Sequence, residues 1–319
     1  MGDLTGETGL SLVADIGGTN TRVALARGPV VDRDTVTRYA NAEHPDLSAV
    51  LARYLADTGV RDAQITGVCV AAAGPVHDGV ADLTNLDWRI DRATLARALS
   101  ADKVAVLNDL QAQGHAIGHI DAADLAVVVP QPEASPWASK LVIGLGTGFN
   151  ACPVFDTAGG RFVPPSEAGH VSLPACDGQM EALVAAMVRD HGFASVEEVL
   201  SGRGITYLHK VLHGETLEPT AIMARLTAGE AQATETGRAF VRITGTVVGD
   251  LALNHLPFGG IYLVGGVTRA IAPWLGPFDM AGAMRAKGRF SGFMEQFGVF
   301  VVSDDYAALT GCASHLSKL

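Results

Sequence analysis

The stretch Leu12-Val-Ala-Asp-Ile-Gly-Gly-Thr-Asn-Thr-Arg-Val-Ala-Leu25 decides the fold expected for this chain. An apolar run ends near Asp15, a polar turn with two glycines follows, and a second strand-like run begins at Thr21. Glycines let a backbone bend sharply and approach a ligand closely. A hairpin that carries glycines, a carboxylate and a hydroxyl can hold a phosphate together with a metal ion. The sequence therefore predicts a phosphate-binding turn formed by Gly17, Gly18, Thr19 and Asn20, with Asp15 beside it.

This glycine pattern differs from two better-known phosphate-binding motifs. No G-x-x-x-x-G-K-S/T run follows it, which excludes a Walker P-loop. A strand-like run follows the glycines where a Rossmann nucleotide site needs a helix. The glycines alone would fit an ordinary hairpin equally well. The phosphate hypothesis therefore depends on whether a second turn of this kind occurs further along the chain.

Composition and charge limit the class of protein. The chain has 319 residues, of which 48% are hydrophobic and 18% charged, so we expect a globular protein with one large core or two moderate ones. Its formal net charge of −11 argues against a non-specific nucleic-acid binder. A local anion site remains compatible with that charge, because backbone amides and a bound cation can outweigh the global field.

Other features of the sequence concern location and metal binding. No apolar run approaches the roughly 18 residues that span a membrane. The short acidic start lacks the basic and apolar regions of a signal peptide, so we expect a cytoplasmic protein. The four cysteines form no C-x-x-C pair and no cysteine–histidine cluster, so we expect no zinc site.

Hydrophobic periodicity predicts a similar order of elements in each half of the chain. In the first half we expect strands at residues 10–15, 21–26, 35–39, 67–72 and 104–107, with helices at 47–57, 92–99 and 110–117. In the second half we expect strands at 141–145, 151–155, 161–163, 260–264 and 298–302, with helices at 180–191, 196–200, 231–256 and 306–315. Two mixed sheets with crossover helices, an α/β fold, would satisfy this pattern.

A second glycine turn lies at the matching place in the second half. Gly144-Leu-Gly-Thr-Gly148 separates two predicted strands, and its amides could also face an anion. Two such turns, each in the first hairpin of a half, favour a polyphosphate ligand held from both sides. The phosphate-binding residues of this turn would be Gly146, Thr147 and Gly148. A further glycine pair, Gly265-Gly266, follows the strand at 260–264 and is a candidate contact for a nucleoside.

Polar side chains near the predicted strand ends suggest chemistry on a sugar. Asn108-Asp109 directly follows a buried strand, where carboxylates line the ligand crevice of α/β proteins. Asp109 could accept a proton from a substrate hydroxyl, although it could also cap the helix that follows.

Three further segments could supply groups to the same ligand. Glu167 and His170 could bind neighbouring hydroxyls, or they could belong to an ordinary solvated loop. Ser195 and Glu198 have capping-box spacing, which leaves Glu197 for a ligand unless it only serves the helix dipole. Asn85, in a polar loop, is a weaker candidate.

Taken together, these segments resemble the bacterial glucokinases, an ATP-dependent group within the hexokinase and actin-like ATPase superfamily. The matching segments are Ala14-Asp-Ile-Gly-Gly-Thr-Asn20, Thr84-Asn-Leu-Asp-Trp88, Leu107-Asn-Asp109, Gly144-Leu-Gly-Thr-Gly148, Glu167-Ala-Gly-His170, Glu197-Glu-Val-Leu-Ser-Gly202 and Val264-Gly-Gly-Val267. Each segment is short and common. Their order along residues 14–267 is what makes the resemblance specific.

The resemblance implies an α/β fold with two ribonuclease-H-like (actin-like ATPase) domains and a ligand cleft between them. The small domain would comprise residues 1–107 and 303–319, and the large domain residues 108–302. The implied reaction is a glycolytic one: ATP phosphorylates D-glucose at its 6-hydroxyl and gives glucose 6-phosphate and ADP. The implied partners are small molecules only, with neither nucleic acid nor membrane, and a homodimer would be ordinary for the family.

The resemblance also implies a role for each matching residue. Glucose would be held by Asn108, Asp109, Glu167, His170 and Glu197, with Asn85 nearby, and Asp109 would act as the general base. The two glycine turns would hold the ATP phosphates, and Gly265 and Gly266 would face the adenosine. Asp15 would organise Mg²⁺ through water.

The sequence departs from the pattern of the resembling family at one position and from the related ROK family after His170. The sugar loop has Ala168 where a second glycine is commoner, and only one cysteine follows His170 where ROK-family kinases carry a cysteine-rich zinc motif. No helix-turn-helix precedes Asp15, which disfavours a DNA-binding sugar repressor. Two alternatives stay open: a kinase for another hexose, and a catalytically weak sugar-binding regulator with the same fold.

Overall fold

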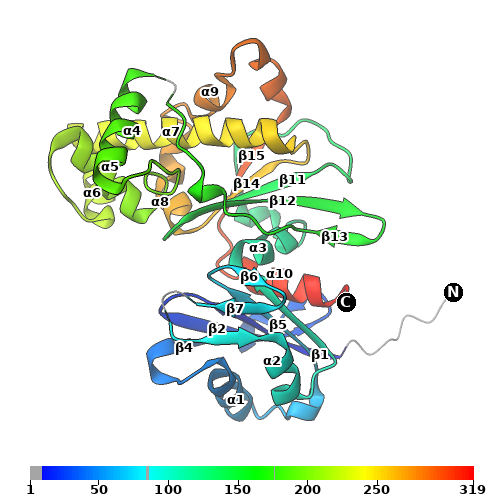
Figure 1. Ribbon diagram of the computed structural model, residues 1–319. Coiled ribbons are helices and arrows are strands. Elements are labelled where there is room, and N and C mark those ends of the chain that lie inside the picture. The colour runs from blue at the N-terminus through cyan, green and yellow to red at the C-terminus, as the bar shows by residue number, and fades with distance from the viewer. Residues whose placement is uncertain (1–8, 84–85, 176) are drawn as a thin grey trace. The chain divides into compact units, whose positions relative to one another are not determined.

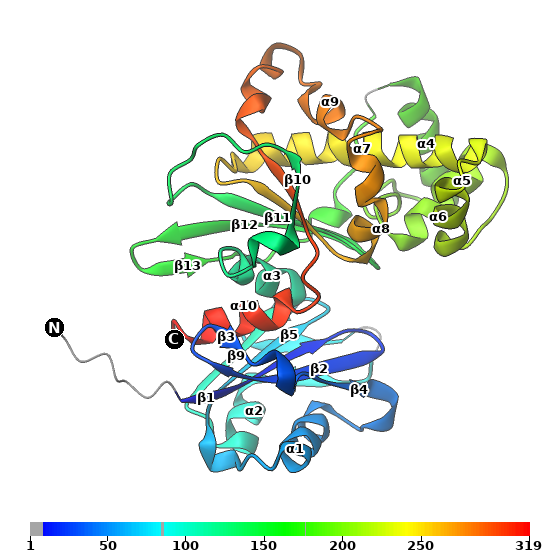
Figure 2. The same cartoon turned by 180° about the vertical axis from the view of Figure 1, so that it is seen from behind.

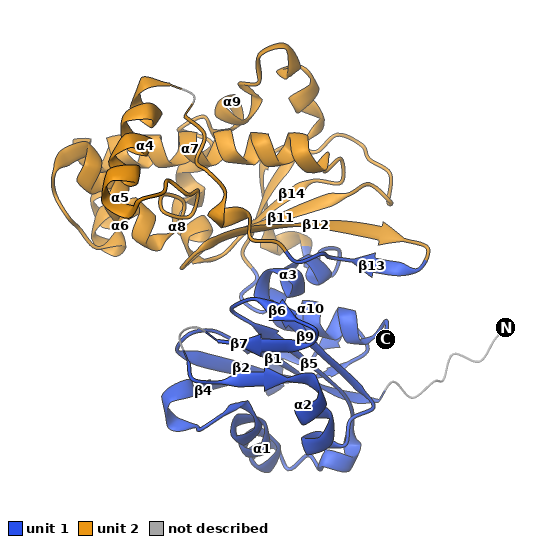
Figure 3. Ribbon diagram, in the orientation of Figure 1, with its two compact units in different colours: residues 1–121, 159–165, 304–319 blue, residues 122–158, 166–303 orange. Residues whose placement is uncertain are grey.

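The computed structural model describes residues 9–83, 86–175 and 177–319. Contacts within the chain divide it into two compact units (Figure 3). Unit 1 comprises residues up to 121 together with 159–165 and 304–319, and unit 2 comprises residues 122–158 and 166–303. Both units are therefore built from segments that are distant in sequence.

Unit 1 extends beyond the small domain predicted from the sequence. Residues 108–121 and 159–165 group with unit 1, whereas the prediction ends the first segment of the small domain at residue 107. Helix α3 (Asp109–Ala116) packs against α10 (Ala307–Leu316), and a Cβ on Gly311 of α10 would lie 1.7 Å from the Ala112 carbonyl oxygen of α3. This close helix crossing ties residues beyond 107 to the C-terminal helix.

The main sheet of unit 1 has the strand order β3-β2-β1-β5-β9, and β4 also pairs with β2. Its strands are β1 (Leu10–Ile16), β2 (Asn20–Arg27), β3 (Val30–Val31), β4 (Thr37–Ala40), β5 (Ile65–Ala72) and β9 (Lys103–Asn108). β1 and β2 are antiparallel, whereas β5 and β9 continue the sheet in parallel. A separate small sheet contains β6 (Val76–His77), β7 (Val80–Asp82) and β8 (Arg89–Asp91).

Alternate residues of β1 serve two different cores in unit 1. Leu12 and Ile16 join the core that includes α1 (Leu47–Thr58) and α2 (Arg92–Leu99), whereas Val13 joins the core that includes α10. This alternation is the period of a strand buried on both faces. Helices thus cover both faces of the unit 1 sheet, as Figures 1 and 2 show from opposite sides.

The sheet of unit 2 begins with the same arrangement as the sheet of unit 1. Its strands lie in the order β10-β15-β14-β11-β12, with bounds β10 (Leu125–Val129), β11 (Lys140–Leu145), β12 (Phe149–Thr157), β14 (Ile261–Val264) and β15 (Val299–Val302). β11 and β12 form an antiparallel hairpin, and β14 and β15 follow in parallel. The short strand β13 (Gly160–Phe162) comes after β12, and its residues group with unit 1.

Helices form the rest of unit 2. They are α4 (Gly178–His191), α5 (Gly202–His213), α6 (Pro219–Thr227), α7 (Ala231–His255), α8 (Gly266–Leu275) and α9 (Met280–Arg285). The 25-residue helix α7 runs through the helical layer in Figure 1 and is largely buried. Short 3-10 turns complete the chain at 33–35, 41–43, 62–64, 122–124, 168–170, 288–290 and 293–296. Among the described residues, we find no helix with the length and hydropathy needed to cross a bilayer.

The mixed α/β class predicted from the sequence is confirmed, and one predicted helix is wrong. Residues 196–200 form turns and not a helix. A single turn forms there, in which Leu200 N donates to Val196 O, and it does not continue as a helix because Gly202 N donates to Gly146 O of the second glycine turn. The helix begins later, at α5, where Ser201 accepts a hydrogen bond from Gly204 N. Ser195 and Glu198 therefore form no capping box.

Candidate active site

The predicted site residues of unit 1 lie at one edge of its sheet. The parallel strands are in a register that places Ile16 beside Ala72 and Ala72 beside Asn108. The chain leaves β1 into the turn Gly17 to Asn20, and it leaves β9 into Asp109. Because carboxyl ends of parallel strands meet at a common edge, the first glycine turn and the Asn108-Asp109 pair open on the same side of this sheet.

A buried asparagine supports the first glycine turn. Asn41, which is 2% exposed, donates from Nδ2 to Gly17 O at 2.8 Å and accepts at Oδ1 from the hydroxyl of Thr21 at 2.8 Å. Its own amide donates to Thr19 O, and Gly17 N donates to Asn20 O. Gly18 and Thr19 remain exposed. The turn is thus fixed from beneath, and its outer face is accessible to an anion.

Asp15 lies next to this turn in a low-polarity position. Burial raises the pKa of its carboxyl, and the Arg22 guanidinium, 3.8 Å away, partly opposes that rise. Burial outweighs the attraction of Arg22, so the charged form of this carboxyl is only partly stabilised here. A cation that approached the carboxylate would stabilise that form further, so this residue fits the predicted magnesium role. The described residues include no cluster of three or more metal-ligating side chains.

Asn108 and Asp109 occupy the start of α3. Asn108 is the N-cap: its Oδ1 accepts from Leu110 N at 3.0 Å, and its Nδ2 donates to Gly74 O at 2.9 Å. Asp109 is the first helical residue and is exposed, and its Oδ1 accepts from Leu110 N at 2.8 Å. The capping role considered for Asp109 therefore belongs to Asn108. The carboxylate of Asp109 is thus held at the start of α3.

The second glycine turn, in unit 2, is supported by a carboxylate. Glu197 Oε2 accepts from Phe149 N at 2.9 Å, directly after Gly148. A Cβ on Gly148 would lie 2.5 Å from that oxygen, so any larger residue would displace the Glu197 side chain. Gly202 N donates to Gly146 O at 2.9 Å, which ties the same turn to the start of α5.

The sugar loop predicted around Glu167 and His170 packs against the same hairpin. Asn150 of β12 bonds both sides of the loop, since its Nδ2 donates to Ser166 O and its Oδ1 accepts from Ala168 N. Gly169 approaches so closely that a Cβ there would lie 2.1 Å from Phe149 O. Glu167 and His170 are both exposed, with Oε2 and Nε2 3.9 Å apart. The loop thus presents an acceptor and a donor side by side.

Gly265 and Gly266 lie at the start of α8, at the same edge of the unit 2 sheet as the second turn. Val264 pairs in register with Gly144, and a Cβ on Gly265 would lie 2.3 Å from Leu145 O. Gly265 also has a φ of 103°, which favours glycine. No side chain caps α8, and a Cβ on Gly266 or Gly146 would meet nothing within 4 Å. Open backbone beside an uncapped helix start fits an anionic nucleotide.

The predicted residues therefore fall into two sets. Unit 1 brings together Asp15, Gly17, Gly18, Thr19, Asn20, Asn108 and Asp109, and unit 2 brings together Gly146, Thr147, Gly148, Glu167, His170, Glu197, Gly265 and Gly266. Asn85 lies outside the described residues. Each set lies on one edge of its own sheet, in the position expected for ligand contacts.

Two residues at the site were not found from the sequence. Asn41 gave no signal, because its partner Gly17 is 24 residues away. Arg203 donates from Nη2 to Glu197 Oε1 at 2.7 Å and to Glu198 Oε1 at 2.9 Å. Its position directly after the matched segment ending at Gly202 was the available clue.

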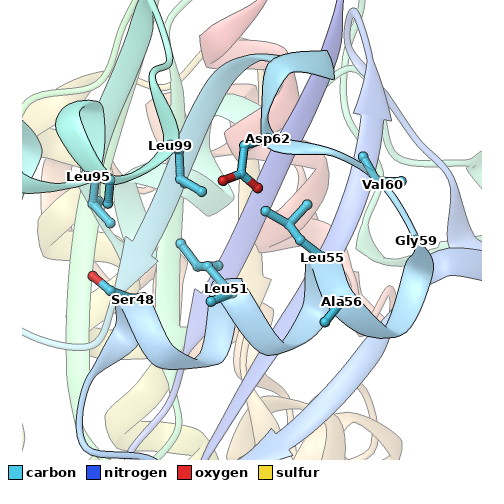
Figure 4. A pocket seen from close by; sticks show the side chains of 11 residues that line it. Ser48, Leu51, Leu55, Ala56, Gly59, Val60, Asp62, Leu95 and Leu99 are labelled. Atoms are coloured by element: carbon cyan, nitrogen blue, oxygen red, sulfur yellow. The ribbon is translucent and has the colours of Figure 1, made fainter.

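A separate groove of about 560 Å³ lies between α1 and α2 in unit 1 (Figure 4). Leucine and alanine side chains form most of its wall, with Ser48 and Asp62 as polar members. It contains none of the predicted site residues. A sugar needs hydroxyl partners around its ring, so this groove does not fit a sugar site.

Comparisons with known proteins show that this chain is similar to glucokinases in sequence and in structure. The glucokinase family model matches residues 12–319. A glucokinase from Chromohalobacter salexigens is 31% identical, with 96% of this chain and 97% of that protein covered. The crystal structure of a glucokinase from an Antarctic psychrotroph has a TM-score of 0.87 at 29% identity and covers 97% of this chain and 99% of its own. A ROK-family glucokinase from Streptomyces griseus, solved with glucose and AMPPNP, has a TM-score of 0.65 at 21% identity and covers 98% and 100% of the two chains, respectively.

Proposed function

This chain belongs to the glucokinase family, and we propose that its residues act as assigned below when it transfers the terminal phosphoryl group of ATP to the 6-hydroxyl of D-glucose. It is a hexose phosphotransferase, and the products are glucose 6-phosphate and ADP. Because ATP is its phosphoryl donor, we propose that it works in the cytoplasm. The homodimer considered above stays a prediction.

One hydrogen bond is the main support for placing the sugar next to the phosphates. Glu197, matched to the sugar, accepts a hydrogen bond from Phe149 N at the end of the turn matched to phosphate. A phosphoryl transfer requires the sugar and the phosphate to meet at a distance near 3 Å, on the order of a hydrogen bond. The backbone amide of Glu197 also donates to Gly169 O of the sugar loop, so this residue joins the phosphate turn to the sugar loop within unit 2.

Asp109 is the proposed general base. Its carboxylate accepts the proton of the 6-hydroxyl while that oxygen bonds to the γ-phosphorus. At the same time the bond from γ-phosphorus to the bridging oxygen breaks, and ADP leaves with that electron pair. Such a base contributes about 10²- to 10⁴-fold to a rate. Asn108 keeps this carboxylate in place, because its side chain caps the helix that carries Asp109.

The sugar hydroxyls would be held by the exposed Glu167 and His170, by Glu197 and by Asn108. Carboxylates accept from hydroxyls, and an imidazole or an amide can donate. The two glycine turns and the uncapped start of α8 supply backbone amides for the phosphates of ATP. Magnesium, when bound with ATP, neutralises phosphate charge, and Asp15 is the residue that would hold it, through water.

We further propose that each main sheet forms a ribonuclease-H-like domain and that both units act on one pair of substrates. The support is the repeated sheet order, with an antiparallel hairpin followed by two parallel strands in each unit. The division of labour follows from the residues: the base belongs to unit 1, and Glu197 belongs to unit 2.

Sugar selectivity is the direct test of the proposed function. ADP release would be measured with MgATP and glucose, mannose, fructose, glucosamine or N-acetylglucosamine. We expect the kcat/KM for glucose to exceed the others at least about tenfold, or roughly 1.4 kcal/mol of discrimination. A larger value for another hexose would replace the substrate but keep the mechanism. Sugar binding without turnover would contradict the proposed function and favour a sugar-binding regulator with the same fold.

A further inference from the structure

Arg203 is an arginine that contacts two carboxylates at once. It lies in the first turn of α5, and its side chain is 56% exposed. A single nitrogen, Nη2, lies 2.7 Å from Glu197 Oε1 and 2.9 Å from Glu198 Oε1. Glu197 and Glu198 are much less exposed, at 14% and 25%. Two neighbouring carboxylates with this little solvent repel one another unless a cation lies between them.

The Glu197 carboxylate is held from two sides. Oε1 meets Arg203, and Oε2 accepts from Phe149 N. The backbone below is fixed as well, because Glu197 N donates to Gly169 O of the sugar loop. An ionised carboxylate has about four acceptor positions, so lone pairs remain for sugar hydroxyls after these bonds are made. Arg203 therefore orients the carboxylate without using up its capacity to bind.

The backbone that carries Arg203, at the start of α5, is fixed by hydrogen bonds. Ser201 Oγ caps the helix through Gly204 N at 3.1 Å, and Gly202 N donates to Gly146 O of the second glycine turn. The backbone on both sides of Arg203 is thus tied to the helix cap and to the turn. A side chain that starts from a fixed backbone loses less entropy when it forms an ion pair.

We propose that Arg203 is a positioning residue for sugar binding: it offsets the charge of Glu198 and directs the Glu197 carboxylate toward the sugar. This inference rests on the proposed function, because it takes Glu197 as a sugar ligand. Arg203 itself touches neither the reacting atoms nor the phosphates in this assignment. Its loss should therefore weaken glucose binding while the chemical step continues.

The first test is the kinetic effect of Arg203→Ala. We expect its glucose KM to rise about tenfold, the size of one charge-assisted hydrogen bond, with kcat within about threefold of the parent. Calorimetry with glucose alone should give the same loss of affinity. Arg203→Lys keeps a cation within reach of both carboxylates and should recover most of that loss.

Two further variants separate positioning from general stability. Arg225→Ala is the matched control, because Arg225 Nη1 also bridges two carboxylates of unit 2, Glu215 at 3.1 Å and Glu230 at 3.5 Å. It should leave the glucose KM unchanged. Glu198→Gln removes the charge that Arg203 offsets, so the Arg203→Ala, Glu198→Gln double variant should bind glucose better than Arg203→Ala alone.

The outcomes separate this inference from the proposed function. A parental glucose KM in Arg203→Ala, or an equal rise in Arg225→Ala, overturns the positioning role. Absence of any rescue by Glu198→Gln overturns the charge-offset argument. If the parent bound glucose without turning it over, the proposed function would fail, whereas calorimetry on Arg203→Ala would still decide the role of Arg203.

Discussion

The two glycine turns resemble each other in sequence and differ in what holds them. The turn from Gly17 to Asn20 rests on Asn41, a neutral amide that is 2% exposed and has a fully buried hydroxyl, that of Thr21, as its other partner. The turn from Gly144 to Gly148 rests on Glu197, a charged group that is itself a proposed ligand. One support belongs to the core, and the other belongs to the site.

Because the two supports differ, we expect Asn41 to matter mainly for the stability of the fold and Glu197 mainly for substrate binding. A buried hydrogen-bonded amide stabilises the fold, and its loss leaves polar groups without partners. A partly exposed carboxylate held by an arginine contributes less to folding but fixes a ligand contact. Changes beneath the first turn should therefore lower the free energy of unfolding, whereas changes beside the second should alter substrate binding.

The largest expected effect comes from Asp109, the only proposed proton acceptor. Asp109→Asn should lower kcat by about 10²- to 10⁴-fold and leave glucose affinity within about threefold, because the amide cannot accept the proton. Steady-state kinetics and glucose calorimetry would measure both. The control is Asp102→Asn, an exposed carboxylate just before the same strand, β9. A kcat near the parental value would remove Asp109 from the mechanism.

The second effect compares the glycines directly. Gly148→Ala should raise the glucose KM about tenfold, because its Cβ would displace Glu197 from a contact worth on the order of 1.4 kcal/mol. Gly17→Ala should not change the glucose KM, since its Cβ would lie 3.5 Å from Asn20 O, an ordinary contact. Both variants can raise the KM for ATP. Equal glucose KM values in the two variants would refute the difference between the turns.

The third effect is on the free energy of unfolding. Here the change beneath the first turn, in unit 1, should have the larger effect, and the change beside the second turn, in unit 2, the smaller one. Asn41→Ala should lower the free energy of unfolding by about 1–3 kcal/mol, because Thr21 and Gly17 O lose their buried partner. Glu197→Gln should change that free energy much less while it raises the glucose KM. Urea unfolding of both variants would test this. If Glu197→Gln proved the more destabilising of the two, Glu197 would be a structural residue first.

The smallest expected effect is a dependence of the stability of unit 1 on pH. Burial lowers the pKa of His315 below its ordinary 6.5, and the ring of His115 lies 4.4 Å from it between centroids. The unfolded chain then binds more protons than the folded one as the pH falls below 6.5, so stability should decrease there. In unit 2 burial also lowers the pKa of His209, so unit 2 should lose stability in acid for the same reason.

His315→Gln should weaken the acid sensitivity of unit 1 and leave that of unit 2 unchanged. Urea unfolding near pH 7.5 and pH 5.5, about one unit on either side of an ordinary histidine pKa, covers the window. Fluorescence of the buried Trp88 would report on unit 1. Trp274 would be replaced by Phe to remove its signal, and Trp137 can stay because it is already 62% exposed and should change little on unfolding. An unchanged pH dependence in His315→Gln would exclude this histidine as the cause.

Local patterns predicted the elements whose signals are complete within a few residues. The hairpin of β1 and β2 followed from two apolar runs with glycines between them, and α2 begins after Asp91, whose side chain accepts from Ala93 N as expected for an N-cap. α5 and α6 were missed. In the region before α5, Ser195 and Glu198 gave a helix signal, but only one turn forms, because Gly202 N donates to the distant Gly146 O and not to a carbonyl of that turn.

The sequence by itself determined which chemical groups are present: glycine turns after strands, a carboxylate at a helix start, and acid and imidazole side chains of the kind that suit sugar hydroxyls. These features are local, because glycine, capping and strand periodicity act over a few residues. Only the tertiary structure decided that Asn41 holds Gly17 from 24 residues away and that Glu197 reaches Phe149 from 48 residues away. Such partners are chosen by how the strands and loops pack, and packing satisfies buried polar groups wherever the chain brings a matching group.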